Sequence, residues 1–137
     1  MNVSALDIST SGLVAYRTRL DAIASNLANM STIRNEDGEN KPYQPRFTIV
    51  APDEKLSTKH GAVGVKVLSV EKEDGEPLMK YEPNNPLAND RGMVAYPNID
   101  MTREFTNALV ATRAYEANIG VMEVTKNLGQ QTLRIVG

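Results

Sequence analysis

Apolar residues recur at helical spacing near the beginning of the chain. Between Leu13 and Met30 they lie alternately three and four residues apart, which is the heptad pattern of a helix with one apolar face. We call this set the N seam; its members are Leu13, Tyr16, Leu20, Ile23, Leu27 and Met30. The pattern predicts an N-terminal helix that ends near Ser31, before the turn-forming residues 35–38.

The end of the chain carries two such seams. The Phe105 seam consists of Met101, Phe105, Ala108, Thr112, Tyr115, Ile119 and Met122, and the Val110 seam of Val110, Ala114, Ala117, Val121, Val124, Leu128, Gln131 and Ile135. They are offset by two residues, or about 200° at 3.6 residues per turn, and so lie on nearly opposite faces of one helix. A helix from an N-cap at Asp100 to Ile135 spans about 50 Å. We expect one seam to take the N-terminal helix and the other to take helices of adjacent subunits.

The middle of the chain is polar and rich in turns. All seven prolines lie between Pro42 and Pro97, so nothing in the outer segments forbids long helices. We therefore divide the chain into an N-terminal helix (1–33), an irregular insert containing β-strands (34–97) and a long C-terminal helix (98–137). Strands are expected at 46–50, 63–70 and 78–81, and a loop at 84–92. The predicted fold is mainly α, with a small β-containing insert and with the two terminal helices paired as an antiparallel coiled coil.

Three asparagines lie inside the predicted helices, close to the apolar seams: Asn26, Asn29 and Asn118. Asparagine is a poor helix former, so its presence at these positions needs a reason. One interpretation is that the three side chains are exposed and tolerated. The other, which we favour, is that they form hydrogen bonds between helices and fix the helical register.

Charge and composition exclude several functions. The chain has 15 basic and 17 acidic residues, a net charge of −2, which argues against a general nucleic-acid binder. No apolar run approaches the ~18 residues of a membrane span, so we expect no direct membrane insertion. The chain has no cysteine, and its single histidine, His60, stands in a loop-like context without neighbouring ligands. We therefore predict no catalytic residue, no cofactor and no metal site.

Three stretches, in order along the chain, resemble the axial proteins of the bacterial flagellar rod and hook. Residues 11–29 resemble the N-terminal signature of that family, and residues 112–119 resemble its C-terminal signature. Residues 92–100 resemble the segment that precedes the last helix in proximal-rod members. The resemblance covers roughly half of the chain. The short chain also agrees with a proximal-rod member, because distal-rod and hook proteins carry larger inserted domains.

The resemblance implies a non-enzymatic structural subunit of the basal-body rod, a hollow helical shaft that crosses the periplasm and transmits torque. The implied partners are other rod proteins, basal-body components and the flagellar type III export apparatus. Export without a cleaved signal agrees with the N-terminus, which has no cationic start followed by an apolar run. Two alternatives stay open from the residues alone. One is a helical adaptor that binds a partner helix in the second seam, and the other is an enzyme that uses His60 and nearby carboxylates, for example on peptidoglycan.

Overall fold

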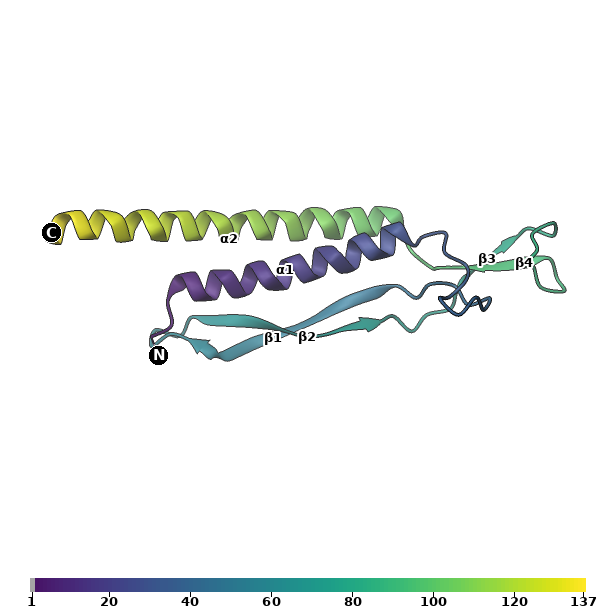
Figure 1. The fold of residues 1–137 in the computed structure, drawn as a ribbon, viewed down its shortest axis with the longest axis horizontal. Helices are drawn as coiled ribbons and strands as arrows, with labels where there is room; N and C mark the ends of the chain where they lie inside the picture. Colours follow the sequence, from purple (N-terminus) through teal and green to yellow (C-terminus); the bar gives the residue numbers. More distant parts are fainter. Residues whose placement is uncertain (1) are drawn as a thin grey trace.

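The computed structural model describes residues 2–137, which form an elongated subunit (Figure 1). A long helix, α2, runs along one side, the shorter helix α1 lies beside it, and a two-stranded ribbon covers the other side of α1. A second, smaller ribbon projects at the end where α2 begins. The elements, in chain order, are α1 (Ala5–Ala28), β1 (Arg46–Ser57), β2 (Val63–Lys72), β3 (Leu78–Tyr81), β4 (Met93–Tyr96) and α2 (Met101–Val136).

Both helices begin at a residue whose side chain caps the free backbone N–H groups of the first turn. In α1, Ser4 Oγ accepts a hydrogen bond from the N–H of Asp7 at 3.3 Å, and Asp7 Oδ2 accepts one from the N–H of Ser4 at 2.8 Å. In α2, Asp100 Oδ1 accepts from the N–H groups of Thr102 and Arg103. The predicted N-cap at Asp100 is therefore confirmed, and the 36 residues of α2 span about 54 Å.

The β1–β2 hairpin is longer than the sequence suggested. The two strands are antiparallel, with Thr48 opposite Val70, and β1 continues past Pro52, which lies opposite Val65. Proline is tolerated there because both strands of a two-stranded ribbon are edge strands. Val65 donates its N–H to Ser11 Oγ on α1 at 3.0 Å, which ties the hairpin to the helix.

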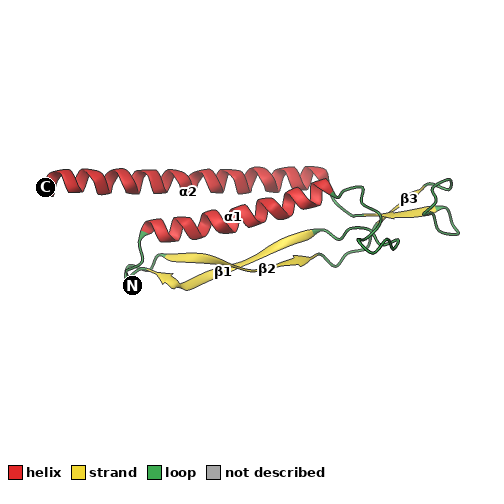
Figure 2. Ribbon diagram, viewed as in Figure 1, coloured by secondary structure: helices red, strands yellow, loops and turns green. Residues whose placement is uncertain are grey.

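The β3–β4 hairpin is a separate small unit whose strands contact neither of the helices nor β1–β2 (Figure 2). Val94 is buried within it, and the Tyr96 hydroxyl donates to both carboxylate oxygens of Glu82 at 3.1 Å. This hydrogen bond to Glu82 raises the pKa of Tyr96 above its ordinary value. The loop predicted at 84–92 lies between the two strands, whereas β4 itself was not predicted.

The predicted fold class is wrong. The chain is 44% helix and 22% strand, with two small antiparallel sheets, and is therefore a mixed α/β structure rather than a mainly α one. The contact between the helices is also not a coiled coil of interlocking large apolar side chains. The buried apolar side chains are mostly small: Ala15, Ala22 and Ile23 on α1, Ala111 on α2 and Val94 on β4. Small side chains let the two helices approach closely, and the hairpin takes the other side of α1.

Candidate assembly site

The face of α2 that α1 covers lies between the two predicted seams. Its centre is marked by Glu104 and Ala111, which are 5% and 0% exposed. The half-buried residues around them are Asn107, Ala108, Ala114, Tyr115, Asn118, Met122 and Thr125. We call this face the covered stripe. The axes of the Phe105 and Val110 seams lie roughly 80° to either side of it at 100° per residue.

Most of both α2 seams is consequently exposed. Phe105 and Val110 are 57% and 53% exposed, and Thr112, Ile119, Val121, Val124 and Leu128 are exposed as well. Only Ala108, Tyr115 and Met122 of the Phe105 seam, and Ala114 of the Val110 seam, reach the covered stripe. The N seam is more enclosed: Ile23 is buried, and Leu13, Tyr16, Leu20, Leu27 and Met30 are half-buried. That these seams contact other subunits stays a prediction.

Helix α2 extends beyond the N-terminal end of α1 (Figure 1). Gly12 of α1 lies against Asn118 of α2, so the antiparallel register places Ala5, the first residue of α1, near residue 125. The last turns of α2, which we call the overhang (residues 126–136), therefore have no other helix of residues 2–137 beside them. The overhang spans about 16 Å and carries the exposed residues Leu128, Leu133, Ile135 and Val136.

Asn26 joins three elements. Its side chain is 2% exposed. Nδ2 donates to the Arg46 carbonyl oxygen at 2.9 Å, and Oδ1 accepts from the Arg46 N–H at 2.7 Å. Nδ2 also donates to Glu104 Oε2 on α2 at 3.3 Å, and Oδ1 accepts from the Tyr43 hydroxyl at 3.0 Å. The carboxamide of this α1 residue thus bonds at once to the start of β1 and to the first turn of α2.

The other two asparagines behave differently. Asn29 follows the last residue of α1, where its Nδ2 donates to the Ser25 carbonyl oxygen at 2.9 Å and its Oδ1 accepts from the Thr32 hydroxyl. Asn118 donates to the carbonyl oxygen of Ala114 within its own helix and covers Gly12 on α1. The structure therefore brings Asn26 and Asn118 to the contact between the helices and leaves Asn29 at a helix end. A role of the three in fixing register stays a prediction.

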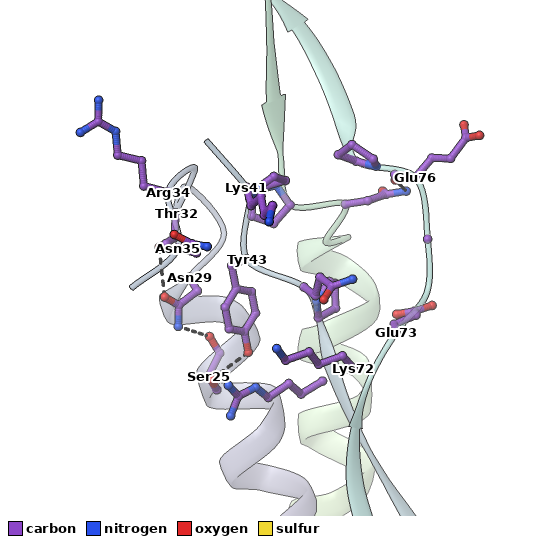
Figure 3. A pocket seen from close by; sticks show the side chains of 18 of the residues that line it. Ser25, Asn29, Thr32, Arg34, Asn35, Lys41, Tyr43, Lys72, Glu73 and Glu76 are labelled. Carbon is purple, nitrogen blue, oxygen red and sulfur yellow. Dashed lines mark hydrogen bonds between the residues drawn. The ribbon is translucent and has the colours of Figure 1, made fainter. Parts of the chain in front are cut away.

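Beside Asn26, the loops that connect the helices and strands line an open pocket of about 1080 Å³ (Figure 3). Tyr43 lies across it and shares a hydrogen bond of 2.8 Å with Ser25, whereas Arg34 and Glu76 point away from its centre. Basic and acidic side chains line it in similar numbers, so the pocket has no strong preference for either sign of charge. Nothing in this lining points to a particular small ligand.

The residues considered for chemistry are not brought together. His60 is exposed in the turn between β1 and β2. Within residues 2–137, no three His, Cys, Asp or Glu side chains are grouped closely enough to hold a metal ion. Neither of the helices in this part of the chain is long and apolar enough to cross a membrane.

Sequence reasoning missed Glu104, although a signal for it was present. Glu104, Ala111, Asn118 and Thr125 recur at intervals of seven residues and follow the covered stripe. A search for large apolar residues does not detect these four positions, because their side chains are small or polar. The four positions identify a close helix contact by side-chain size instead of hydrophobicity.

Comparisons with known proteins agree at both ends of the chain. Residues 6–34 match the family described as flagella basal body rod protein, and residues 90–135 match the C-terminal family of the flagellar basal body rod FlgEFG proteins. The flagellar basal-body rod protein FlgC of Salmonella typhimurium is 38% identical over 94% of this chain and 93% of its own length. That of Bacillus subtilis is 34% identical over 95% of both chains, and that of Aquifex aeolicus is 36% identical over 94% of this chain and 92% of its own length. The chain belongs to the FlgC family of flagellar basal-body rod proteins.

Proposed function

We propose that this structural subunit of the flagellar basal-body rod is a non-enzymatic building block of its proximal part, and that the exposed seams of α2 contact neighbouring subunits. The single observation that carries the proposal is the placement of the covered stripe. Because α1 packs between the Phe105 seam and the Val110 seam, most of both seams is left free. The subunit can therefore be joined on two sides without any rearrangement of its own helices.

The exposed area supports contacts with several neighbours. Residues 2–137 belong to a 15.0 kDa chain with an accessible surface of 9880 Å². A compact monomer of that mass exposes about 7,000 Å². The excess of about 2,900 Å² compares with the roughly 800 Å² that one partner contributes to a standard protein interface. The surplus is large enough for about three such interfaces on one subunit.

The two seams have different shapes, so a contact between them is heterologous. The Phe105 seam offers large side chains, whereas the Val110 seam offers mostly Val, Ala and Leu. Heterologous contacts that do not close into a ring continue as a helix. Each buried methylene contributes about 0.8 kcal/mol, and repetition over several neighbours makes the assembly stiff enough to transmit torque. A hollow helical rod is the form that such packing supports.

The partners are other basal-body rod proteins. We further infer that the chain reaches the rod unfolded, through the flagellar type III export apparatus. The thin core supports this inference, because the buried apolar side chains are few and mostly alanine. Little apolar burial has to be undone before the chain can be threaded.

Purified basal bodies provide the test. Mass spectrometry should find a handful of copies of this chain per particle, and absence from otherwise complete basal bodies contradicts the proposal. The chain has no native cysteine, so single cysteines report contacts cleanly. In intact basal bodies, Val124→Cys should cross-link to a neighbouring subunit through a short thiol-to-amine reagent. The matched variant Asn127→Cys, on the face of α2 between the two seams and opposite α1, should cross-link far less.

A further inference from the structure

Asn26 pairs with β1 as a neighbouring strand would. It bonds to both the N–H and the carbonyl oxygen of Arg46, the first residue of the strand, at 2.7 and 2.9 Å. The β1–β2 hairpin is thereby fixed to α1 at its base, and the Ser11–Val65 hydrogen bond fixes it again further along. Ser11 and Asn26 are 15 residues apart, or about 22 Å along α1. The two contacts are therefore independent places at which the seating of the hairpin can be measured.

Glu104 of α2 favours the same orientation of the Asn26 carboxamide as the backbone of Arg46 does. Its carboxylate is almost fully buried and accepts from Asn26 Nδ2, and within residues 2–137 it forms no ion pair. Because Glu104 Oε2 accepts this hydrogen bond from Asn26 Nδ2, the NH2 edge of Asn26 faces α2. In the same orientation, Nδ2 can donate to the Arg46 carbonyl oxygen and Oδ1 can accept from the Arg46 N–H. A flipped carboxamide would place Oδ1 against the carboxylate and NH2 against the Arg46 N–H.

The two strands of the hairpin pack against α1 and not against α2 (Figure 1). Two polar links connect α2 with the hairpin base. One is the path from Glu104 through Asn26 to Arg46, which is buried. The other is an exposed ion pair of 3.8 Å between Arg103 and Glu73, which contributes little because solvent screens it. The buried path is the one that can transmit the position of α2 to the hairpin.

We propose that Asn26 and Glu104 are a positioning pair through which α2 stabilises the seating of the β1–β2 hairpin on α1. The inference rests on the proposed function, because in the rod the neighbouring subunits hold α2. Neighbouring subunits that contact α2 thereby influence the placement of the hairpin. Neither residue has to touch a neighbouring subunit for this influence to operate.

The test uses a reporter far from the pair. Ser11→Cys and Val65→Cys are introduced together, so that the Ser11 hydroxyl contact is absent from every protein compared, and a short bifunctional thiol reagent is applied to basal bodies. We expect Glu104→Ala to lower the equilibrium constant for the seated hairpin by up to about tenfold, the effect of losing one buried hydrogen bond, and thereby to weaken the 11–65 cross-link. The matched control Glu116→Gln changes an exposed carboxylate of α2 whose ion pair is with Arg113, and it should leave the cross-link unchanged.

A swapped pair, Asn26→Asp combined with Glu104→Gln, separates positioning from general stability. The amide that this variant carries at position 104 can donate to the carboxylate that it carries at position 26, so the link between the helices is restored. A carboxylate at position 26 cannot, however, donate to the Arg46 carbonyl oxygen. The double variant should therefore enter basal bodies and still give the weak 11–65 cross-link.

Wild-type cross-linking in the swapped pair, or in an incorporated Glu104→Ala, overturns the positioning role. If Glu104→Ala is not incorporated into basal bodies, the cross-link in the swapped pair alone decides the question. If the swapped pair is not incorporated either, the 11–65 cross-link is compared in the purified subunits. Absence of the unmodified chain from basal bodies counts against the proposed function instead.

Discussion

Asn118 of α2 lies so close to Gly12 of α1 that a methyl group on Gly12 would come within 2.9 Å of Asn118 Oδ1. Asn118 has little freedom to withdraw, because its Nδ2 donates to the Ala114 carbonyl oxygen at 2.9 Å. The absence of a side chain at position 12 is therefore required by a neighbour on another helix, 106 positions later in the chain. This pair is a determinant of how closely α1 approaches α2.

Enlarging Gly12 should separate the helices. We expect Gly12→Leu to lower the free energy of unfolding of the purified subunit by about 1–3 kcal/mol, the usual cost of overpacking. The matched control is Gly120→Leu, because a side chain at Gly120 meets nothing within 4 Å. It should raise stability by up to about 1 kcal/mol, since glycine is a poor helix former. Equal effects of the two substitutions in thermal unfolding would show that Gly12 is not constrained by Asn118.

A charge in the Val110 seam should block assembly without unfolding the subunit. Val121 is half exposed, so Val121→Asp places the carboxylate in solvent in the free subunit but in an apolar contact in the rod. We expect a soluble variant whose incorporation into basal bodies falls at least tenfold, measured by quantitative mass spectrometry. Asn127→Asp adds the same charge to an exposed position outside the seams and should be incorporated normally. Normal incorporation of Val121→Asp removes the Val110 seam from the assembly contacts.

Hydrogen exchange along α2 should follow the cover that α1 provides. The amides of residues 104–122 belong to the part that α1 packs against, whereas the overhang has no partner in the subunit. An isolated helical segment of about 11 residues is only marginally stable in water. In the dilute free subunit, residues 126–136 should exchange much faster than residues 104–122, and the difference should shrink in basal bodies. Uniformly slow exchange in the free subunit contradicts an overhang completed by neighbours.

The start of α1 should loosen in acid. Hydrogen bonds from the backbone N–H and the hydroxyl of Ser4 hold the pKa of Asp7 below its ordinary value of 3.8. Because the folded pKa is the lower one, the stabilisation is fully present above about pH 3.8 and is lost as the pH falls through the folded value. The protection factor of the first turn of α1, which compares its observed hydrogen exchange with that of an unstructured chain at the same pH, should therefore fall at the lowest pH. Asp7→Asn should show no such titration, and an identical pH response in both proteins would exclude Asp7 as the cause.

The sequence identified those elements whose signals are local. Asp100 was recognised as a helix cap because a capping side chain acts on the next two or three residues. The hairpin was seen only in part, because its extension past Pro52 depends on β1 being an edge strand. β4 was missed because a four-residue strand next to Pro97 carries little periodicity. Its pairing with β3 becomes visible only in three dimensions.

The sequence predicted the apolar seams of α2, but not the face of α2 on which α1 packs. The seams were found from large apolar residues, and α1 was expected to occupy one of them. It packs instead on a row of small and polar residues, because close approach of two helices favours small side chains over large ones. The hydrogen-bond partners of Asn26 could likewise not be predicted from the sequence. They are a backbone group 20 residues away and Glu104, and no residue pattern relates these three positions.

The β3–β4 hairpin has a consequence for how one subunit can meet unlike neighbours. Its strands touch no other helix or strand of the described chain, and only the connections before Leu78 and after Tyr96 hold it. Its direction is therefore set by two short linkers and is independent of how the helices are packed. The hairpin can therefore adopt different directions against unlike neighbours while the helical part of each subunit stays unchanged.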